Sequence, residues 1–321
     1  MKKVFKVIYN AFCVLGCLLG AGFISGAEVI TFFVRFGYWG VLGIVLASIL
    51  FGVVIYKSIS SAEEHQSVAK FNFLPYCQTF IAGAMLSGII NVISQLLKIK
   101  YIIVLLCIAI FLFIAICSGI KVANAINTFV SIFALCILPI ICNYIEINNL
   151  QIASTNSCLQ ASIFACLYVA MNSIACMPII NNIKANKKQR IYIAVLTAFI
   201  MAALLSVVYV ILVNKSFKTD MPILELVSSS ELLKWVYIIL LVVAMLSTLF
   251  SACSGAKKIF AKLDNNFLES ICTTMAVMAI SFVGFGSIIN YMYPVIGIAL
   301  FVQYVLNKMY KRPKKSQKIT Q

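Results

Sequence analysis

Residues 16–28 of this chain read Gly-Cys-Leu-Leu-Gly-Ala-Gly-Phe-Ile-Ser-Gly-Ala-Glu, and they lie inside an apolar run that extends from Val4 to Val34. As one α-helix this run would be about 45 Å long, well beyond the roughly 30 Å hydrocarbon core of a bilayer. Glycines at positions 16, 20, 22 and 26 remove side-chain support from the helix. The sequence therefore predicts a membrane helix that breaks near the bilayer midplane, where irregular backbone is tolerated only if it faces protein or a watery cavity.

The composition is that of a protein embedded in a membrane. Of the 321 residues, 63% are hydrophobic and only 11% are charged, and the mean hydropathy is +1.06. A soluble globular domain is much less apolar. The formal net charge of +16 comes from short basic clusters between apolar runs, which is the distribution of topology determinants rather than of a phosphate-binding face. We therefore expect the lipid bilayer, and no nucleic acid, as a partner.

Apolar runs of about 20 residues, separated by polar breaks, predict ten membrane spans. They lie near residues 5–34, 39–57, 74–97, 101–118, 122–143, 158–180, 191–213, 232–254, 269–286 and 288–307. With the N-terminus in the cytoplasm, this topology places all of the 25 Lys and Arg residues on the cytoplasmic side except Arg35, Lys98, Lys100, Lys215, Lys218 and Lys234. Because cytoplasmic loops are enriched in Lys and Arg, the distribution supports a multi-pass protein of the plasma membrane with both termini cytoplasmic.

The ten spans divide into two halves of five. Residues 1–145 are predicted to form the first five-helix repeat, 146–157 an extracytoplasmic loop, 158–307 the second repeat and 308–321 a basic cytoplasmic tail. The second half also opens on an interrupted span, with Ala170-Met171-Asn172-Ser173 followed by Pro178. An odd number of spans per half inverts one half relative to the other. Interrupted helices at matching positions then indicate an inverted-repeat transporter with its site at the midplane. The expected fold class is an all-α polytopic membrane protein whose first and sixth helices are broken.

Glu28 is the acidic residue that we place deep in the membrane. A buried carboxylate costs several kcal/mol unless it is paired, solvated or protonated, so Glu28 is a candidate for binding a cation or a substrate. The alternative is a structural or gating charge that reaches water or Arg35. These two residues share a helix face, but about 10 Å of helical rise separates them.

Other polar and small residues extend the candidate site. Gly-x-x-x-Gly pairs such as Gly22 and Gly26 are typical of helix packing, but the length of the run together with Ser25 and Glu28 favours an unwound site. Asn172 and Ser173 supply hydrogen-bonding groups at the matching point of the sixth span, where an intramembrane Asn can also serve helix packing alone.

Three hydroxyls of the eighth span, on Ser247, Thr248 and Ser251, fall within about one helical turn. Such hydroxyls commonly bond to their own helix, but two of them facing an unwound backbone can complete the oxygen shell of a hard cation such as Na⁺.

Motifs of soluble enzymes are absent from the sequence. His65 is the only histidine, no P-loop or Gly-x-Ser-x-Gly elbow occurs, and the 12 cysteines form no Cys-x-x-Cys pair. We expect no enzymatic activity, no metal centre and no cofactor other than Na⁺ or H⁺ as a coupling ion.

Two motifs at opposite ends of the chain resemble a known family. Gly20-Ala-Gly-Phe-Ile-Ser-Gly-Ala-Glu28 with Phe32-Phe33, and Gly284-Phe-Gly-Ser with Tyr293-Pro294-Val-Ile-Gly297, resemble the YkvI-type family of bacterial membrane proteins. That family is similar to amino acid, polyamine and organocation transporters of the LeuT-type five-plus-five fold.

The resemblance implies roles for individual residues. Backbone amides at Ala21 and Gly22 would face an anionic or polar substrate group, beside Ser25, Gly26 and Glu28, with Asn172 and Ser173 on the opposite wall. Carbonyl groups just before Gly20 would contribute to a cation site that Ser247, Thr248 or Ser251 faces from the eighth span. Relatives often carry Gln where this chain has Glu28, and a carboxyl there favours proton coupling or a cationic substrate.

We therefore expect an ion-coupled secondary transporter of the bacterial inner membrane for a small organic solute, amino acid-like or an amine, that works by alternating access. The alternative is a receptor or structural subunit of the same fold that binds a ligand without transporting it.

Overall fold

A computed structural model describes residues 2–64, 73–118, 120–145, 157–213, 221–292 and 295–299, together with the single residues 215, 217, 219 and 302. Every regular element within these residues is helical. The long helices are α1 (Lys2–Leu18), α4 (Tyr38–Glu64), α5 (Leu74–Leu97), α6 (Tyr101–Ser118), α7 (Ile120–Tyr144), α8 (Cys158–Ile180), α9 (Lys187–Leu212), α11 (Glu231–Ala256) and α12 (Asn266–Ser281). Short helical turns lie between them: α2 (Ala21–Ser25), α3 (Ala27–Phe32), η1 (Val34–Phe36), α10 (Pro222–Val227), η2 (Lys257–Ile259), η3 (Ala261–Leu263), α13 (Phe285–Ser287) and the π-helical η4 (Ile288–Met292).

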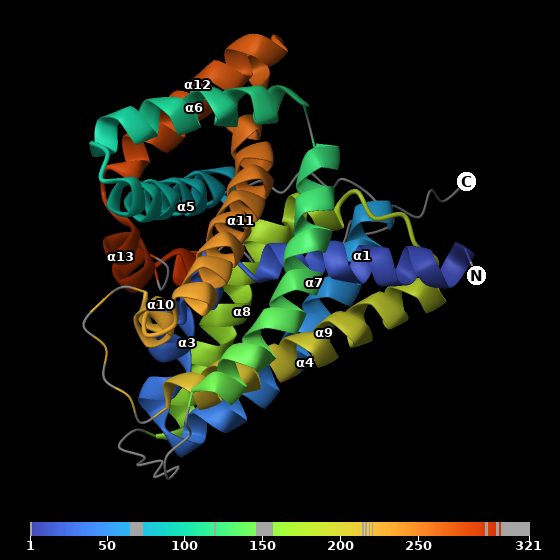
Figure 1. Cartoon of the computed structure of the whole chain (residues 1–321). Helices are drawn as coiled ribbons and strands as arrows, with labels where there is room; N and C mark the ends of the chain where they lie inside the picture. The colour runs from blue at the N-terminus through green and yellow to red at the C-terminus, as the bar shows by residue number, and fades with distance from the viewer. Residues whose placement is uncertain are drawn as a thin grey trace, which may run out of the picture.

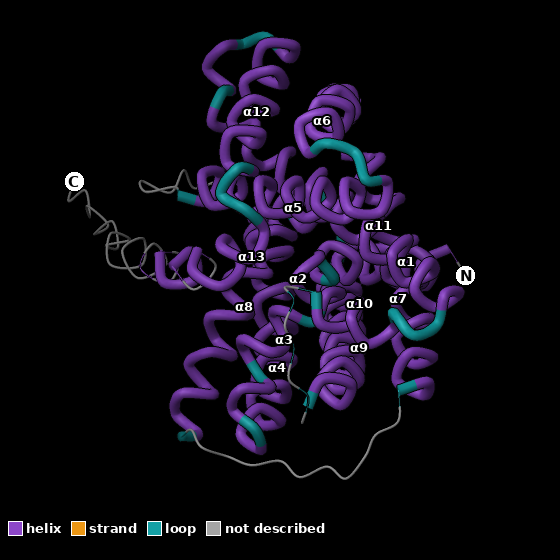
Figure 2. The backbone as a smooth tube through the Cα atoms, turned by 60° about the vertical axis from the view of Figure 1, so that its left-hand side comes forward, coloured by secondary structure: helices purple, strands orange, loops and turns teal. Residues whose placement is uncertain are grey.

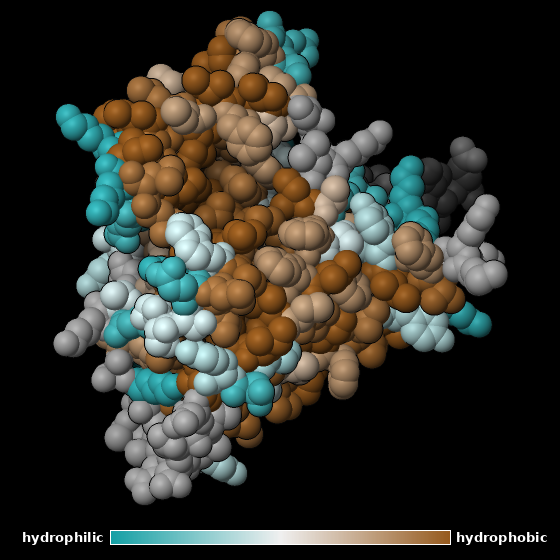
Figure 3. All heavy atoms as spheres, in the orientation of Figure 1, coloured by the Kyte–Doolittle hydropathy of each residue, from teal (hydrophilic) through white to brown (hydrophobic). Residues whose placement is uncertain are grey.

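Six of the described helices are long and apolar enough to cross a membrane, namely α4, α5, α7, α8, α9 and α11, and α1, α6 and α12 are shorter apolar helices. The chain is a helical membrane protein. Its outer surface is apolar where a soluble protein would be polar: Ile110 is 64% exposed and Phe199 is 73% exposed. Figure 3 shows hydrophobic residues over the middle of one face, with hydrophilic residues gathered at its margins.

The predicted break in the first span is present. Helix α1 ends at Leu18, and the chain resumes as the two short helices α2 and α3. The predicted spans 74–97, 101–118 and 158–180 coincide with α5, α6 and α8. The span predicted at 269–286 is too long, because α12 ends at Ser281 and Gly284, with a φ of 94°, turns the chain before α13. Most of the predicted loop 146–157, part of the last span and the whole tail 308–321 lie outside the described residues.

The predicted break in the sixth span is wrong, because α8 runs as one helix from Cys158 to Ile180. Its polar stretch contains no glycine. The side-chain amide of Asn172 donates to the carbonyl of Tyr168 one turn earlier, at 3.2 Å, so this polar group is accommodated within the helix. Pro178 lies in the last turn, where its missing N–H leaves one carbonyl of the preceding turn free without ending the helix there.

Helix α11 runs through the middle of the bundle and packs against α5, α7 and α8 (Figure 1). Among the six long apolar helices, α11, α8 and α5 are the most buried. Helix α4 packs between α8 and α9, α12 packs against α5 and α6, and α1 packs against α7, α8 and α9. The short helices α2 and α10 lie in contact near the centre of the bundle (Figure 2).

Gly16 lies at a close approach between α1 and α7. A Cβ atom at this position would lie only 1.8 Å from the carbonyl oxygen of Asn127 in α7. No side chain fits there unless one helix moves. The crossing of the first and fifth predicted spans therefore depends on this glycine.

We predict that Gly16→Ala lowers the stability of the protein by roughly 1–3 kcal/mol, the cost of forcing extra atoms into a packed interior. The measurement is the thermal unfolding midpoint of the purified protein in detergent. Gly43→Ala in α4 is the control, because the atom nearest to its Cβ would be a ring carbon of Phe33 at 3.3 Å rather than a backbone atom. Equal effects of the two substitutions would contradict the close helix crossing.

Candidate functional site

The break in the first span consists of two interruptions. Gly20 is extended, with φ −64° and ψ 176°, and joins α1 to α2. Gly26 joins α2 to α3 with a φ of 87°, a left-handed conformation that L-residues rarely adopt. A Cβ atom at Gly26 would also lie 2.8 Å from a methyl group of Leu212. The helical hydrogen-bond pattern is thus interrupted at Gly20 and at Gly26, two of the predicted glycines.

Glu28 turns back toward the first interruption. Its side chain is only 2% exposed, and a Cβ atom at Gly22 would lie 2.1 Å from its Oε1 atom, so the carboxyl rests directly against the backbone of α2. The place where the resemblance implied an anionic substrate group, beside Ala21 and Gly22, is therefore taken by a carboxyl of the chain itself. The absence of a side chain at Gly22 is what permits this contact.

The hydrogen-bond partner of Glu28 comes from α8. The Nδ2 atom of Asn172 donates to Oε2 of Glu28 at 3.4 Å. Among the described residues, no Lys or Arg side chain contacts the Glu28 carboxyl. The guanidinium of Arg35 lies instead over the rings of Phe36 and Phe164, at 4.9 and 4.5 Å from their centroids. Glu28 therefore makes no contact with Arg35 among the described residues, and its role as a binding group or a structural charge stays a prediction.

A small cavity of about 10 Å³, roughly the room that one water molecule requires, opens beside Glu28. Its polar lining comes from Gly20, Glu28, Asn172 and Thr248, and its apolar lining from Ile81, Met85, Met171 and Ala175. The hydroxyl of Thr248 is buried and has no hydrogen-bond partner within the described part of the chain. The same holds for the Ser173 hydroxyl. A buried hydroxyl without a hydrogen-bond partner carries a free-energy cost, so a partner for the Thr248 hydroxyl would be favourable.

The three predicted hydroxyls of α11 all lie at the break. Ser247 donates to the carbonyl of Gly16 at 3.2 Å and also contacts the side-chain oxygen of Asn127. Thr248 faces Gly20, where a Cβ atom would lie 3.0 Å from its Oγ1. Ser251 donates to the carbonyl of Ala175 in α8 at 2.7 Å. The helix thus reaches both the broken first span and α8.

Ser25 and Gly26 do not line the cavity, and neither do the predicted residues Gly22, Ser173, Ser247 and Ser251. The Ser25 hydroxyl donates to the carbonyl of Gly22 at 3.1 Å and accepts from the amide of Ala27 at 3.3 Å, so it stabilises the second interruption. Gly26 supplies the turn itself. Both residues shape the break, and neither presents a free polar group to the cavity.

One carbonyl group near the end of α8 lacks its helical donor. Because Pro178 has no N–H, the carbonyl of Ile174 lacks its helical donor, and the side-chain Nε2 of Gln78 in α5 donates to it at 3.0 Å. Gln78 in turn lies against Gly255 of α11, where a Cβ atom would be 1.8 Å from its side-chain oxygen. One glutamine therefore ties α5, α8 and α11 together.

Four polar residues of the site were not among the predicted ones: Gln78, Asn127, Tyr168 and Tyr237. Tyr237 of α11 donates to the carbonyl of Ile24, at the end of α2, at 2.5 Å. Tyr168 is buried with its hydroxyl unpartnered among the described residues, and its ring packs on those of Phe32, Phe33 and Phe51. Tyr168 lies four residues before Asn172 and therefore on the same helix face, which was the signal in the sequence that could have identified it.

No protein-family model matches this chain, and a search of curated proteins finds no relative. The geometry of the site is therefore what supports a function.

We predict that Gln78→Leu lowers stability by about 1–3 kcal/mol, because it leaves the Ile174 carbonyl buried without a donor. In a Pro178→Ala background the helix regains the amide that can reach this carbonyl, so the same substitution should cost about 1 kcal/mol less. Unfolding midpoints of the four proteins in this double-mutant cycle give the coupling energy. Additive effects would contradict the assignment of Gln78 as the substitute donor.

Proposed function

We propose that this chain is an ion-coupled secondary transporter of a small organic solute that carries an ammonium group, either an amine or an amino acid-like compound. The observation that carries the proposal is the Glu28 carboxyl, buried at the break of a membrane helix beside a small polar cavity and without a cationic partner among the described residues. A buried, unpaired charge costs several kcal/mol. Such a carboxyl therefore holds a proton in the closed site, or it holds a cation.

The lining of the cavity fits an ammonium group and its carbon chain. A primary ammonium donates three hydrogen bonds, and the Glu28 carboxyl and the Thr248 hydroxyl are acceptors on two sides of the cavity. Ile81, Met85 and Met171 supply the apolar wall for an alkyl portion, and methionine side chains adapt readily to ligands of different shape. The present cavity is too small for such a solute, so binding requires the surrounding helices to move.

The packing of the helices supports a five-plus-five inverted repeat as the fold. If the chain is divided into two halves of five spans, the matching partners are α1 with α8, α4 with α9, α5 with α11 and α6 with α12. Each of these pairs is in direct contact. Contact between matching helices is what a twofold relation between the halves would produce, with the binding site at the interface of the repeats.

Alternating access would then depend on the broken first span. Its carbonyl groups are held by side chains of α11, through Ser247 at Gly16 and Tyr237 at Ile24. Exchange of these hydrogen bonds for contacts with a cation or a substrate would favour a second arrangement of the helices. We place the protein in the bacterial inner membrane with both termini cytoplasmic, because this orientation puts most of its Lys and Arg residues inside.

The test is a thermal-stability screen of the purified protein against primary amines, diamines and amino acids, with and without Na⁺ and at two pH values. A ligand should raise the unfolding midpoint. Because protons compete with the ammonium for Glu28, this stabilisation should weaken as the pH falls. Glu28→Gln should lower the affinity at least about ten-fold, equivalent to roughly 1.4 kcal/mol, and remove the pH dependence.

Glu231→Gln is the matched control, since Glu231 is an exposed carboxyl in the first turn of α11. Stabilisation that survives Glu28→Gln unchanged would show that Glu28 is only a structural charge. Uptake of the best ligand into proteoliposomes tests transport itself. Binding without uptake would favour a receptor that keeps this fold.

A second prediction concerns the unpartnered hydroxyl of Thr248. In the ligand-free protein, Thr248→Val should leave stability unchanged or raise it by up to about 1 kcal/mol, because it removes a buried hydroxyl that has no partner. The same substitution should reduce the stabilisation by Na⁺ or by the ammonium ligand several-fold. Thr274→Val in α12 is the control, because the Thr274 hydroxyl donates to the Ser270 carbonyl at 2.8 Å. A ligand response that Thr248→Val leaves intact would exclude this hydroxyl from the site.

A further inference from the structure

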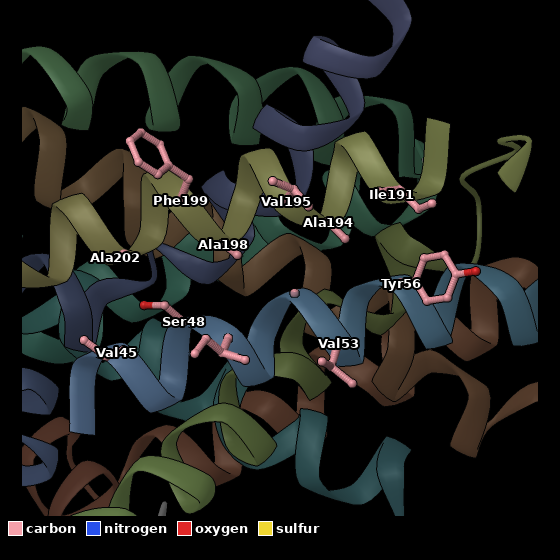
Figure 4. A pocket seen from close by; sticks show the side chains of 12 residues that line it. Val45, Ser48, Val53, Tyr56, Ile191, Ala194, Val195, Ala198, Phe199 and Ala202 are labelled. Atoms are coloured by element: carbon pink, nitrogen blue, oxygen red, sulfur yellow. The ribbon is translucent and has the colours of Figure 1, made fainter. Parts of the chain in front are cut away.

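A second feature of the molecule, separate from the Glu28 cavity, is an apolar groove of about 740 Å³ along the junction of α4 and α9 (Figure 4). One ridge carries Val45, Ile49 and Val53 of α4, and the opposite ridge carries Ile191, Val195 and Phe199 of α9. These residues recur at every fourth position, so each ridge is a single stripe along its helix.

The groove exists because its floor is made of small residues. Gly52 meets Ala198 at the centre, where a Cβ atom on Gly52 would lie 3.3 Å from that of Ala198. The ridges stand out on both sides: Ile49 is 59% exposed and Val195 is 62% exposed. Both helices are among those long enough to cross a membrane, so the groove faces the bilayer.

The length of the groove matches one leaflet. From Val45 to Tyr56, its two ends along α4, the helical rise is about 17 Å. Half of a hydrocarbon core of roughly 30 Å is about 15 Å. An apolar channel of this length accommodates an acyl chain that starts at the membrane interface and ends near the midplane.

Both ridges continue into lysines at the same end. Lys57 follows Val53 by four residues on the α4 ridge, and Lys187 precedes Ile191 by four residues on the α9 ridge, with Lys188 beside it. Tyr56 and Ile191 mark this end in Figure 4. All three lysines are exposed. Because side chains in a helix lean toward its N-terminus, Lys57 is expected to lean toward the groove, and Lys187 and Lys188, in the first turn of α9, are expected to extend past the end of the groove toward the headgroups.

We propose that this groove binds an anionic phospholipid, with an acyl chain along α4 and α9 and the phosphate between Lys57, Lys187 and Lys188. A zwitterionic lipid has no net charge to match three lysines. A second copy of this chain fits less well, because a symmetric interface within the membrane would bring the same lysines of both copies together.

The test uses the purified full-length protein in detergent with added dioleoyl phosphatidylglycerol or dioleoyl phosphatidylcholine. Phosphatidylglycerol should raise the unfolding midpoint at lower concentration than phosphatidylcholine, and native mass spectrometry should detect it as a retained lipid. The triple variant Lys57→Gln/Lys187→Gln/Lys188→Gln should lose this preference. Each lysine near the membrane surface is expected to contribute roughly five-fold in affinity.

Lys100→Gln/Lys258→Gln/Lys262→Gln is the matched control, since it removes the same charge from exposed positions elsewhere and should keep the preference for phosphatidylglycerol. Ala198→Phe fills the floor of the groove and should weaken binding of the lipid while all lysines remain. Equal stabilisation by the two lipids, or an equal loss in the control triple variant, would overturn the proposal. So would equal stabilisation by glycerol phosphate without acyl chains, which would indicate a headgroup site alone.

Discussion

The structure depends on one constraint: backbone groups that leave a helix inside a membrane must find hydrogen-bond partners within the protein, because the hydrocarbon offers none. The first span breaks at Gly20 and Gly26, and α8 contains Pro178 near its end. The resulting free carbonyl groups are met by side chains of other helices: Ser247 bonds to Gly16, Tyr237 to Ile24 and Gln78 to Ile174. Ser251 bonds in addition to the Ala175 carbonyl of α8.

This constraint explains why α5, α8 and α11 are the most buried of the long apolar helices. They carry or receive the side-chain hydrogen bonds that the breaks require. Helices α4, α7 and α9 take part in fewer of these hydrogen bonds, and a smaller share of their residues is buried. Satisfied polar networks of this kind specify one arrangement of helices, and breaking them has a free-energy cost.

The two groups of charged residues discussed above lie in opposite environments, one buried and one exposed. Glu28 is a charge-bearing group in the interior, held by one amide donor and shaped by the missing side chain of Gly22. Lys57, Lys187 and Lys188 lie at the surface, where a helix end meets the membrane interface and a cation is at little cost. An interior carboxyl with so few partners carries a desolvation cost, whereas the exposed lysines remain hydrated.

The sequence by itself determined the membrane class, the limits of most helices and the break of the first span. These follow from the thickness of the bilayer, the rise of a helix and the conformational freedom of Gly20 and Gly26, all of which are local. It also indicated Glu28, because a carboxyl within an apolar run is unusual whichever residues pack around it. The tertiary structure alone decided that α8 is continuous, that Asn172 reaches Glu28 and that Gln78 replaces the missing amide of Pro178. Those outcomes depend on side chains from distant parts of the chain, 144 residues away for Asn172 and Glu28, whose pairing is set by helix packing and leaves no periodic trace in the sequence.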